Sequence, residues 1–95
     1  MSVPITVVSE SVDSFFNGAG IATTTPQKLD PIPYEFLKGV TISNDGASSI
    51  FIGPTQTTAL FEIGAGEKSQ RIPVDSPTAI WIRSGGSVAF SWLGA

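Results

Sequence analysis

The sequence predicts an all-β protein: a compact antiparallel β-sandwich or jelly-roll-like barrel with an extended N-terminal arm. Two patterns carry this prediction. From residue 39 onward, apolar and polar residues alternate with a period of two, as in strands that bury one face. Gly, Pro, Asn and Asp interrupt the alternation every few positions, which suits short strands joined by tight turns. In contrast, no stretch keeps helical periodicity long enough to predict a helix.

Strands are expected over residues 39–44, 49–53, 60–63, 70–74, 79–83 and 87–93. Alternate aliphatic side chains in these strands would face a shared core, namely Val40, Ile42, Ile50, Ile52, Ile63, Ile72, Val74, Ile80, Ile82 and Val88. Phe61, Phe90 and Trp92 are in phase with these positions and are therefore also predicted to lie in the core.

Glycine-containing turns set the expected connections between these strands. Asp45-Gly46 is expected to reverse the chain, so that residues 49–53 return after residues 39–44. Gly85-Gly86 is the clearest hairpin signal and would join the last two strands.

The chain becomes regular only after Lys38. We therefore divide the single domain into an N-terminal arm with edge strands, residues 1–36, and an antiparallel sandwich core, residues 37–95. Within the arm, residues 5–8 (ITVV) could form one strand, whereas Asn17–Gly20 (NGAG) is expected to be a turn.

Prolines restrict the rest of the arm. Pro26 lacks an amide N–H, so residues 22–29 are expected to form an edge strand or an extended segment. Pro31 and Pro33 forbid a helix and favour an extended run over residues 30–34.

Charge is scarce in this chain, which limits its partners. Charged residues make up 14% of the 95 residues, against roughly 25% in typical soluble domains. Because so little charge is available to cover a surface, we expect part of the surface to be buried against other proteins. The net charge of −3 opposes binding to nucleic acid.

Targeting segments are not predicted either. No run approaches the length of a membrane span, so no membrane partner is expected. Residues 1–12 lack the basic start and the unbroken apolar run of a secretory signal. A soluble product made in a cytoplasm is therefore expected.

Catalytic and metal-binding residues are mostly missing, and the chain is not expected to be an enzyme. It contains no His and no Cys, which removes imidazole bases, Ser-His and Cys-His nucleophile pairs, and disulfides. A paired-carboxylate glycosidase is left open, but most acidic residues lie at turns or on polar faces, where solvated carboxylates are expected. No catalytic residue, metal or cofactor is predicted.

Two glycine-containing motifs are better explained as turns than as ligand sites. Gly64–Ser69 (GAGEKS) resembles a phosphate-binding loop, but Glu67 interrupts the required Gly-Lys-Ser triplet, and a strand follows instead of a helix. Asn44-Asp45-Gly46 would suit the start of a calcium loop, but no further acidic residue follows at the required spacing.

Several large apolar residues fall outside the predicted core pattern. They lie in the arm or out of phase in their strands, and they form the candidate protein interface: Phe15, Phe16, Ile32, Tyr34, Phe51 and Trp81. Two interpretations are open. The arm could cover a second face of the sandwich and bury these residues. Alternatively, some of them could form a patch that contacts other subunits, because aromatic residues dominate interface energetics.

Four segments occur in a fixed order: Leu37–Gly53 (LKGVTISNDGASSIFIG), Ile63–Val74 (IGAGEKSQRIPV), Asp75–Trp81 (DSPTAIW) and Val88–Trp92 (VAFSW). Their order and spacing resemble small β-sandwich structural proteins of tailed bacteriophages, in which a KGVTI-N strand pairs with a strand ending in IG. The resemblance does not cover residues 1–36. It implies turns at Gly39, Gly53, Gly66 and Asp75, and core positions at Val40, Ile42, Ile50 and Ile52.

The resemblance implies a virion structural protein, specifically a capsid decoration (cement) protein on the head surface. Its expected partners are the major capsid protein and further copies of itself, as a trimer or dimer, because multivalent contacts slow release from a lattice. The alternative is a tail- or fibre-associated β-sandwich module that binds another virion protein or a glycan, with Trp81 and Arg83 as the candidate glycan contacts. An enzyme ranks last.

Overall fold

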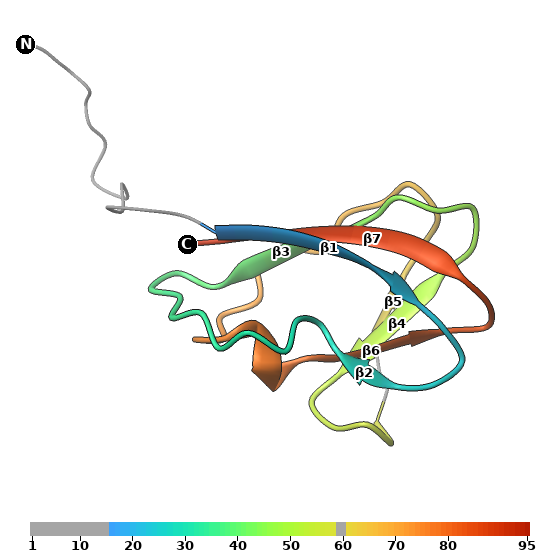
Figure 1. The fold of residues 1–95 in the computed structure, drawn as a ribbon. Helices are drawn as coiled ribbons and strands as arrows, with labels where there is room; N and C mark the ends of the chain where they lie inside the picture. Colours follow the sequence, from blue (N-terminus) through green and yellow to red (C-terminus); the bar gives the residue numbers. More distant parts are fainter. Residues whose placement is uncertain (1–15, 59–60) are drawn as a thin grey trace, which may run out of the picture.

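The computed structural model describes residues 16–58 and 61–95, which form two antiparallel sheets packed face to face (Figure 1). One sheet has the strand order β1-β7-β3 and the other β2-β6-β4-β5. The predicted sandwich is confirmed, and the two sheets do not close into a barrel. The strands are β1 (Phe16–Ala22), β2 (Gln27–Lys28), β3 (Val40–Asn44), β4 (Ile50–Gly53), β5 (Phe61–Ile63), β6 (Trp81–Ser84) and β7 (Val88–Gly94).

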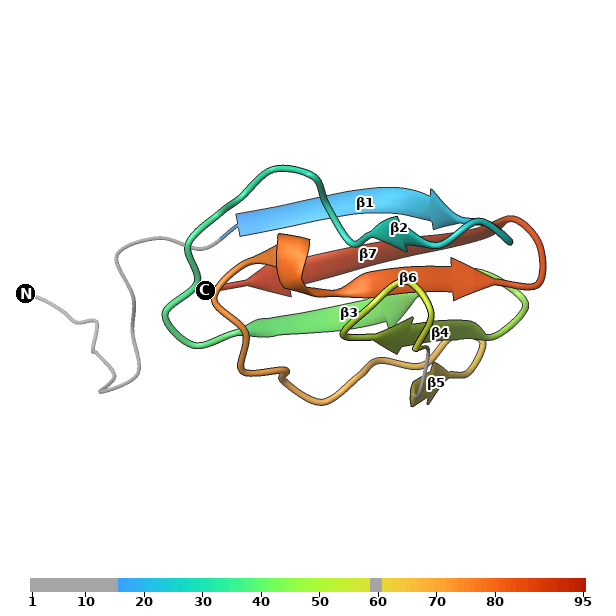
Figure 2. The ribbon, with the colours of Figure 1, turned by 90° about the horizontal axis from the view of Figure 1, so that it is seen from below.

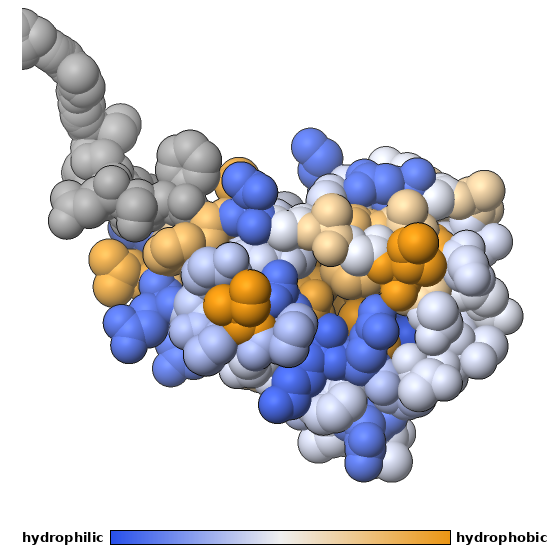
Figure 3. Space-filling model, viewed as in Figure 1, coloured by the Kyte–Doolittle hydropathy of each residue, from blue (hydrophilic) through white to orange (hydrophobic). Residues whose placement is uncertain are grey.

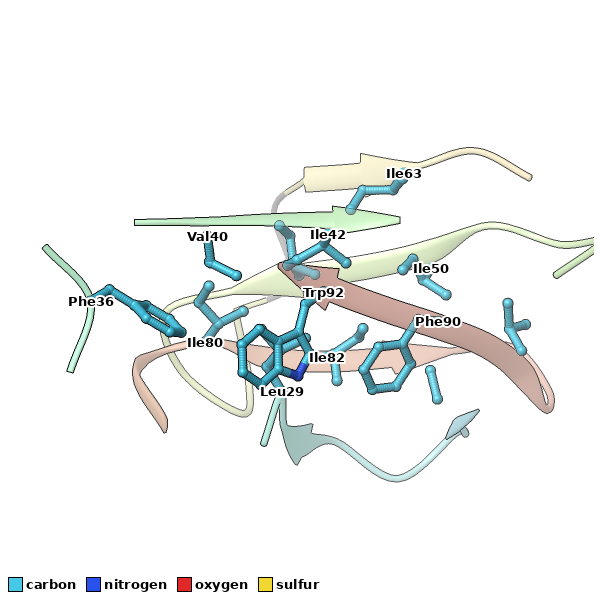
Figure 4. Packing of buried hydrophobic residues seen from close by; sticks show 13 residues of the cluster. Leu29, Phe36, Val40, Ile42, Ile50, Ile63, Ile80, Ile82, Phe90 and Trp92 are labelled. Atoms are coloured by element: carbon cyan, nitrogen blue, oxygen red, sulfur yellow. The ribbon is translucent and has the colours of Figure 1, made fainter. Parts of the chain in front are cut away.

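Strand β7 is the centre of the three-stranded sheet and supplies the largest core side chains. Phe90 and Trp92 point between the sheets, as predicted, and are almost fully buried (Figure 4). The predicted alternation is also confirmed in β3, β4 and β6. Buried residues from both sheets and from the connections pack on this centre: Ala22, Leu29, Phe36, Val40, Ile42, Ile50, Ile52, Ile63, Ile80, Ile82 and Val88.

The two glycine turns connect the sheets instead of forming hairpins, which corrects the predicted pairing. After Asp45-Gly46 the chain crosses from β3 to β4 in the opposite sheet, and after Gly85-Gly86 it crosses from β6 to β7. Neither β3 nor β7 has an edge available for a hairpin partner. Strand β7 lies between β1 and β3, and the other edge of β3 is bridged to residues 68–72, at Val40–Ile72 and Ser43–Lys68.

The predicted turn at Asn17–Gly20 is wrong, because these residues lie inside β1. Strand β1 pairs with β7 over its whole length, and its glycines face the aromatic rings of that strand. A Cβ atom at residue 18 would lie 2.6 Å from Nε1 of Trp92, and one at residue 20 would lie 2.9 Å from Cζ of Phe90. Glycine is therefore needed here for close approach within a strand and not for a turn.

The predicted strand at residues 70–74 is reduced to a single bridge. Ile72 exchanges two backbone hydrogen bonds with Val40, of 2.7 and 2.9 Å. Pairing stops there because the Val74 N–H, the next that could reach β3, donates instead to the Ile72 carbonyl at 2.8 Å. Gly39 fits this crossing only as glycine, since its φ is +117° and a Cβ would lie 2.1 Å from the Ile72 carbonyl oxygen.

Phe61 is not a core residue, although Ile63 in the same strand is. The Phe61 side chain is 64% exposed. The four-stranded sheet has one strand more than the other sheet, and β5 lies beyond the edge at β3 (Figure 2). Phe61 therefore has the phase of a core residue but no opposing strand to cover it.

Residues 16–36 provide an edge strand to each sheet, with β1 in one and β2 in the other. The prediction that Pro26 confines its segment to an edge is confirmed by β2, which among the described residues pairs with β6 alone. Residues 30–34 contain bends, one of them capped by Asp30, whose Oδ1 accepts the Ile32 N–H at 2.9 Å. The proposed strand at residues 5–8 belongs to residues 1–15, which lie outside the described residues.

A buried asparagine connects the two sheets at the β3–β4 crossing. Asn44 is 1% exposed, and its Nδ2 donates to the carbonyls of Ser48 and Ile63 at 2.7 and 2.8 Å. Its Oδ1 accepts the Gly46 N–H at 2.9 Å. This one side chain therefore fixes the turn and also joins the end of β3 to β5 in the other sheet.

Replacing Gly18 with Ala should destabilise the fold, because the new methyl group would overlap the buried Trp92 ring. We expect the free energy of unfolding to fall by about 1–3 kcal/mol. Gly85→Ala is the matched control, since a Cβ there meets nothing within 4 Å. Urea unfolding followed by tryptophan fluorescence checks this, and equal stability of the two variants would contradict the close approach of β1 to β7.

Replacing Asn44 with Ala should cost about 2–4 kcal/mol, because backbone groups of the turn and of β5 lose their partner in a buried site. Asn17→Ala, at an exposed position of β1, serves as the control and should change stability by less than about 0.5 kcal/mol. Thermal unfolding measured by circular dichroism compares them. A loss at Asn44 no larger than at Asn17 would show that this network does not hold the sheets together.

Candidate protein-interaction surfaces

Two of the predicted interface residues belong to the packing of the fold. Phe16 and Tyr34 are half-buried and stack with ring centroids 4.8 Å apart. Tyr34 also lies 5.6 Å from the Trp92 ring, and Phe36 packs edge-on against that ring at the same separation. The segment that joins β2 to β3 thus covers one end of the core, whereas the first interpretation expected the arm to cover a second face of the sandwich.

The other two predicted arm residues are Ile32 and Phe15. Ile32 is 50% exposed on the β2–β3 connection, and Phe15 lies outside the described residues. Leu37, on the same connection, is 82% exposed. Sequence reasoning missed Leu37 because it stands alone just before the regular alternation begins.

Phe51 and Trp81 both lie on the outer face of the four-stranded sheet, as their phase predicted. Both are half-buried. The Arg83 guanidinium lies 5.2 Å from the centre of the Phe51 ring, in a cation–π contact. Lys28 is opposite Trp81, and Glu62 is opposite Phe51. We call this surface, which carries both signs of charge, the mixed face.

The outer face of the three-stranded sheet has a different character. Its outward positions follow from the pairing of β1, β7 and β3, and none of them is charged. Ile21 and Leu93 are 57% and 52% exposed on it. We call this surface the uncharged face, and it consists of Asn17, Ala19, Ile21, Thr41, Ser43, Ala89, Ser91 and Leu93.

Sequence reasoning missed the uncharged face. Most of its residues are small and give no hydrophobic signal of their own. The available signal was the off-phase position of Leu93 beside Trp92, and of Ile21 beside Ala22. In the space-filling view, apolar residues on the side that carries β1 form separate patches between hydrophilic ones (Figure 3).

An apolar groove of about 620 Å³ lies under the overhanging strand β5. Phe61 and Ile63 form one wall, and Ile72 and Val74 form another. Glu62, Glu67, Lys68 and Arg71 also line it. Within the described ranges, no group of three or more Asp or Glu residues could hold a metal ion.

No protein-family model, curated protein or solved structure matches this chain. In residues 16–58 and 61–95, no helix is long and apolar enough to cross a membrane.

Replacing Phe16 with Ala should lower the free energy of unfolding by about 1–2 kcal/mol, because a half-buried aromatic ring loses its stacking partner and its contact with the core. Leu37→Ala, at a more exposed apolar site, should be neutral within about 0.5 kcal/mol. Chemical unfolding of both variants measures this. If Phe16→Ala leaves stability unchanged, the residue belongs to a surface and not to the core.

Proposed function

We propose that this chain is a structural protein of a tailed-bacteriophage virion, made in the host cytoplasm and bound to the outside of the head as a decoration protein. It would contact the major capsid protein as a small homo-oligomer and stabilise the lattice through protein–protein contacts. The β-sandwich fold is consistent with this role. The sequence resemblance in residues 37–92 gives the phage context.

The uncharged face is the observation that carries the proposal. A partner that covers its centre displaces water from apolar and small polar groups, whereas charged groups lie at its margin, at Asp45, Lys68 and Arg71. The centres of protein interfaces are depleted of charged residues in the same way. Ile21 and Leu93, each more than half exposed, are the side chains best placed to enter pockets of a partner.

The size of this face suggests how such a protein would work. Three strands spaced by about 4.8 Å, with few residues of each facing outward, cover much less than the roughly 800 Å² that one partner contributes to a stable interface. A single contact would therefore be weak. An oligomer that engages several capsid subunits together would dissociate slowly, since release requires all contacts to break.

A substitution on the uncharged face tests the proposal. Leu93→Lys places a charge at an exposed position on the central strand of the contact and should reduce occupancy about tenfold or more, as judged by cosedimentation with purified empty heads of the phage that encodes the chain. Trp81→Ser, on the mixed face, is the control and should bind as the unaltered chain does. The proposal is wrong if the unaltered chain does not cosediment.

The same experiment also tests whether the mixed face makes the capsid contact. If Trp81→Ser or Phe51→Ser removes binding while Leu93→Lys does not, the capsid contact lies on the mixed face and the assignment to the uncharged face is wrong. If all three variants bind normally, neither sheet face carries the contact.

A glycan-binding module of a tail or fibre is the second candidate function. Its support is the mixed face, where Trp81 shares a surface with Arg83, as sugar-binding sites combine aromatic rings with polar groups. The Arg83 guanidinium already lies over Phe51, which reduces its availability to a ligand. A glycan array distinguishes the two: binding that is lost in Trp81→Ala would favour this candidate over the decoration role.

A further inference from the structure

The backbone of β1 has one set of polar groups directed to an open edge. In the three-stranded sheet, Asp45 N–H donates to the Ala89 carbonyl at 2.9 Å, and Ala95 N–H donates to the Gly39 carbonyl at 3.1 Å. Odd-numbered residues of β7 therefore bond to the β3 side, and its even-numbered residues bond to β1.

The register carries this alternation into β1. Gly18 pairs with Trp92 and Gly20 with Phe90, so the even-numbered residues of β1 bond to β7. The N–H and C=O groups of Asn17, Ala19 and Ile21 then point away from the sheet. A contact of Gln27 agrees with this, because its Nε2 reaches the Ile21 carbonyl from outside the ladder, at 2.8 Å.

Among the edges in the described part of the chain, β1 is the one without protection against pairing. Strand β2 is two residues long and carries Lys28, and β5 is three residues long and carries Glu62. The edge of β3 is bridged by the segment at residues 68–72. In contrast, β1 has seven residues, an unbroken register without a bulge, and no charged residue or proline. Such an edge is a template for another strand.

We propose that β1 pairs antiparallel with β1 of a second copy of this chain, about a two-fold axis that passes beside Ala19. The edge is complementary to itself in this register, because Ala19 faces Ala19 and Asn17 faces Ile21 of the second copy. About six main-chain hydrogen bonds would form. The Gln27 side chain gives up one exposed hydrogen bond to the Ile21 carbonyl when the second strand arrives.

This pairing would join two three-stranded sheets into one continuous sheet of twice the width. Both copies of the uncharged face would then lie side by side on the same surface, which doubles the area offered to a partner. The pairing is inferred from the β1 edge alone. Its use on a capsid rests on the proposed function.

One introduced cysteine tests the pairing, because the chain has no cysteine of its own. In the proposed register the two Ala19 Cα atoms lie about 5.5 Å apart, within the range of a disulfide. Under mild oxidation, Ala19→Cys should form a disulfide-linked dimer about tenfold faster, or more, than Ala89→Cys, the control on the same face but one strand inward. Equal rates for the two variants would overturn the proposal.

The native mass gives an independent readout. The mass of the unaltered chain by light scattering should rise with concentration from one chain of 9.9 kDa toward two. Ala19→Lys should stay at one chain, since edge lysines block strand pairing, while Ala89→Lys should dimerise as the unaltered chain does. An unaltered chain that stays monomeric, or an oligomer that persists in folded Ala19→Lys, would overturn the proposal.

Neither measurement contains a capsid, so the two proposals can fail separately. A dimer broken by Ala19→Lys that does not bind heads supports the pairing and contradicts the decoration role. If the unaltered chain binds heads but Ala19→Lys has the same native mass as the unaltered chain, the pairing is contradicted and the decoration role is not.

Discussion

The fold depends on one packing constraint, which is the space that the side chains of β7 need between two sheets about 10 Å apart. Phe90 and Trp92 fill that space, and the neighbouring strand makes room by presenting Gly18 and Gly20 to their rings. At these two positions β1 consequently contributes only backbone atoms, and no side chain, to the packing between the sheets. The same constraint that closes the core therefore leaves an edge strand that is thin, uncharged and regular, and from this edge we infer the self-pairing.

The alternation in the sequence was sufficient to predict the sandwich and the burial of residues such as Ile42 and Ile82. It did not predict which strands are neighbours, because a turn such as Gly85-Gly86 specifies a reversal of the chain but not whether the next strand lies beside the last or across the core. Asn17–Gly20 was interpreted as a turn because glycine has two uses, and only the position of the β7 rings distinguishes them. The exposure of Phe61 depends on the unequal widths of the two sheets, which no local pattern reports.

The candidate interface residues also include some whose place could be predicted from the alternation and some whose place could not. Phase alone placed Phe51 and Trp81 on an outer face, but it could not show that Arg83 covers the Phe51 ring, since that contact joins neighbouring strands. Phe16 and Tyr34 come from segments without a periodic pattern, and their stacking on the end of the core depends on the path of the β2–β3 connection. The uncharged face emerges only when β1, β3 and β7 are aligned, because its small residues are unremarkable in each strand taken singly.

Site-resolved amide hydrogen exchange, recorded on dilute and concentrated protein, tests the central claim that β1 is bonded to β7 on one side and open to a second copy on the other. The account predicts slow exchange at Gly18, Gly20 and Ala22 at both concentrations. At Asn17, Ala19 and Ile21 it predicts fast exchange in dilute protein and slow exchange in concentrated protein. Slow exchange of these three amides at both concentrations would mean that the edge is covered within one chain, and fast exchange at both would mean that no second strand pairs there.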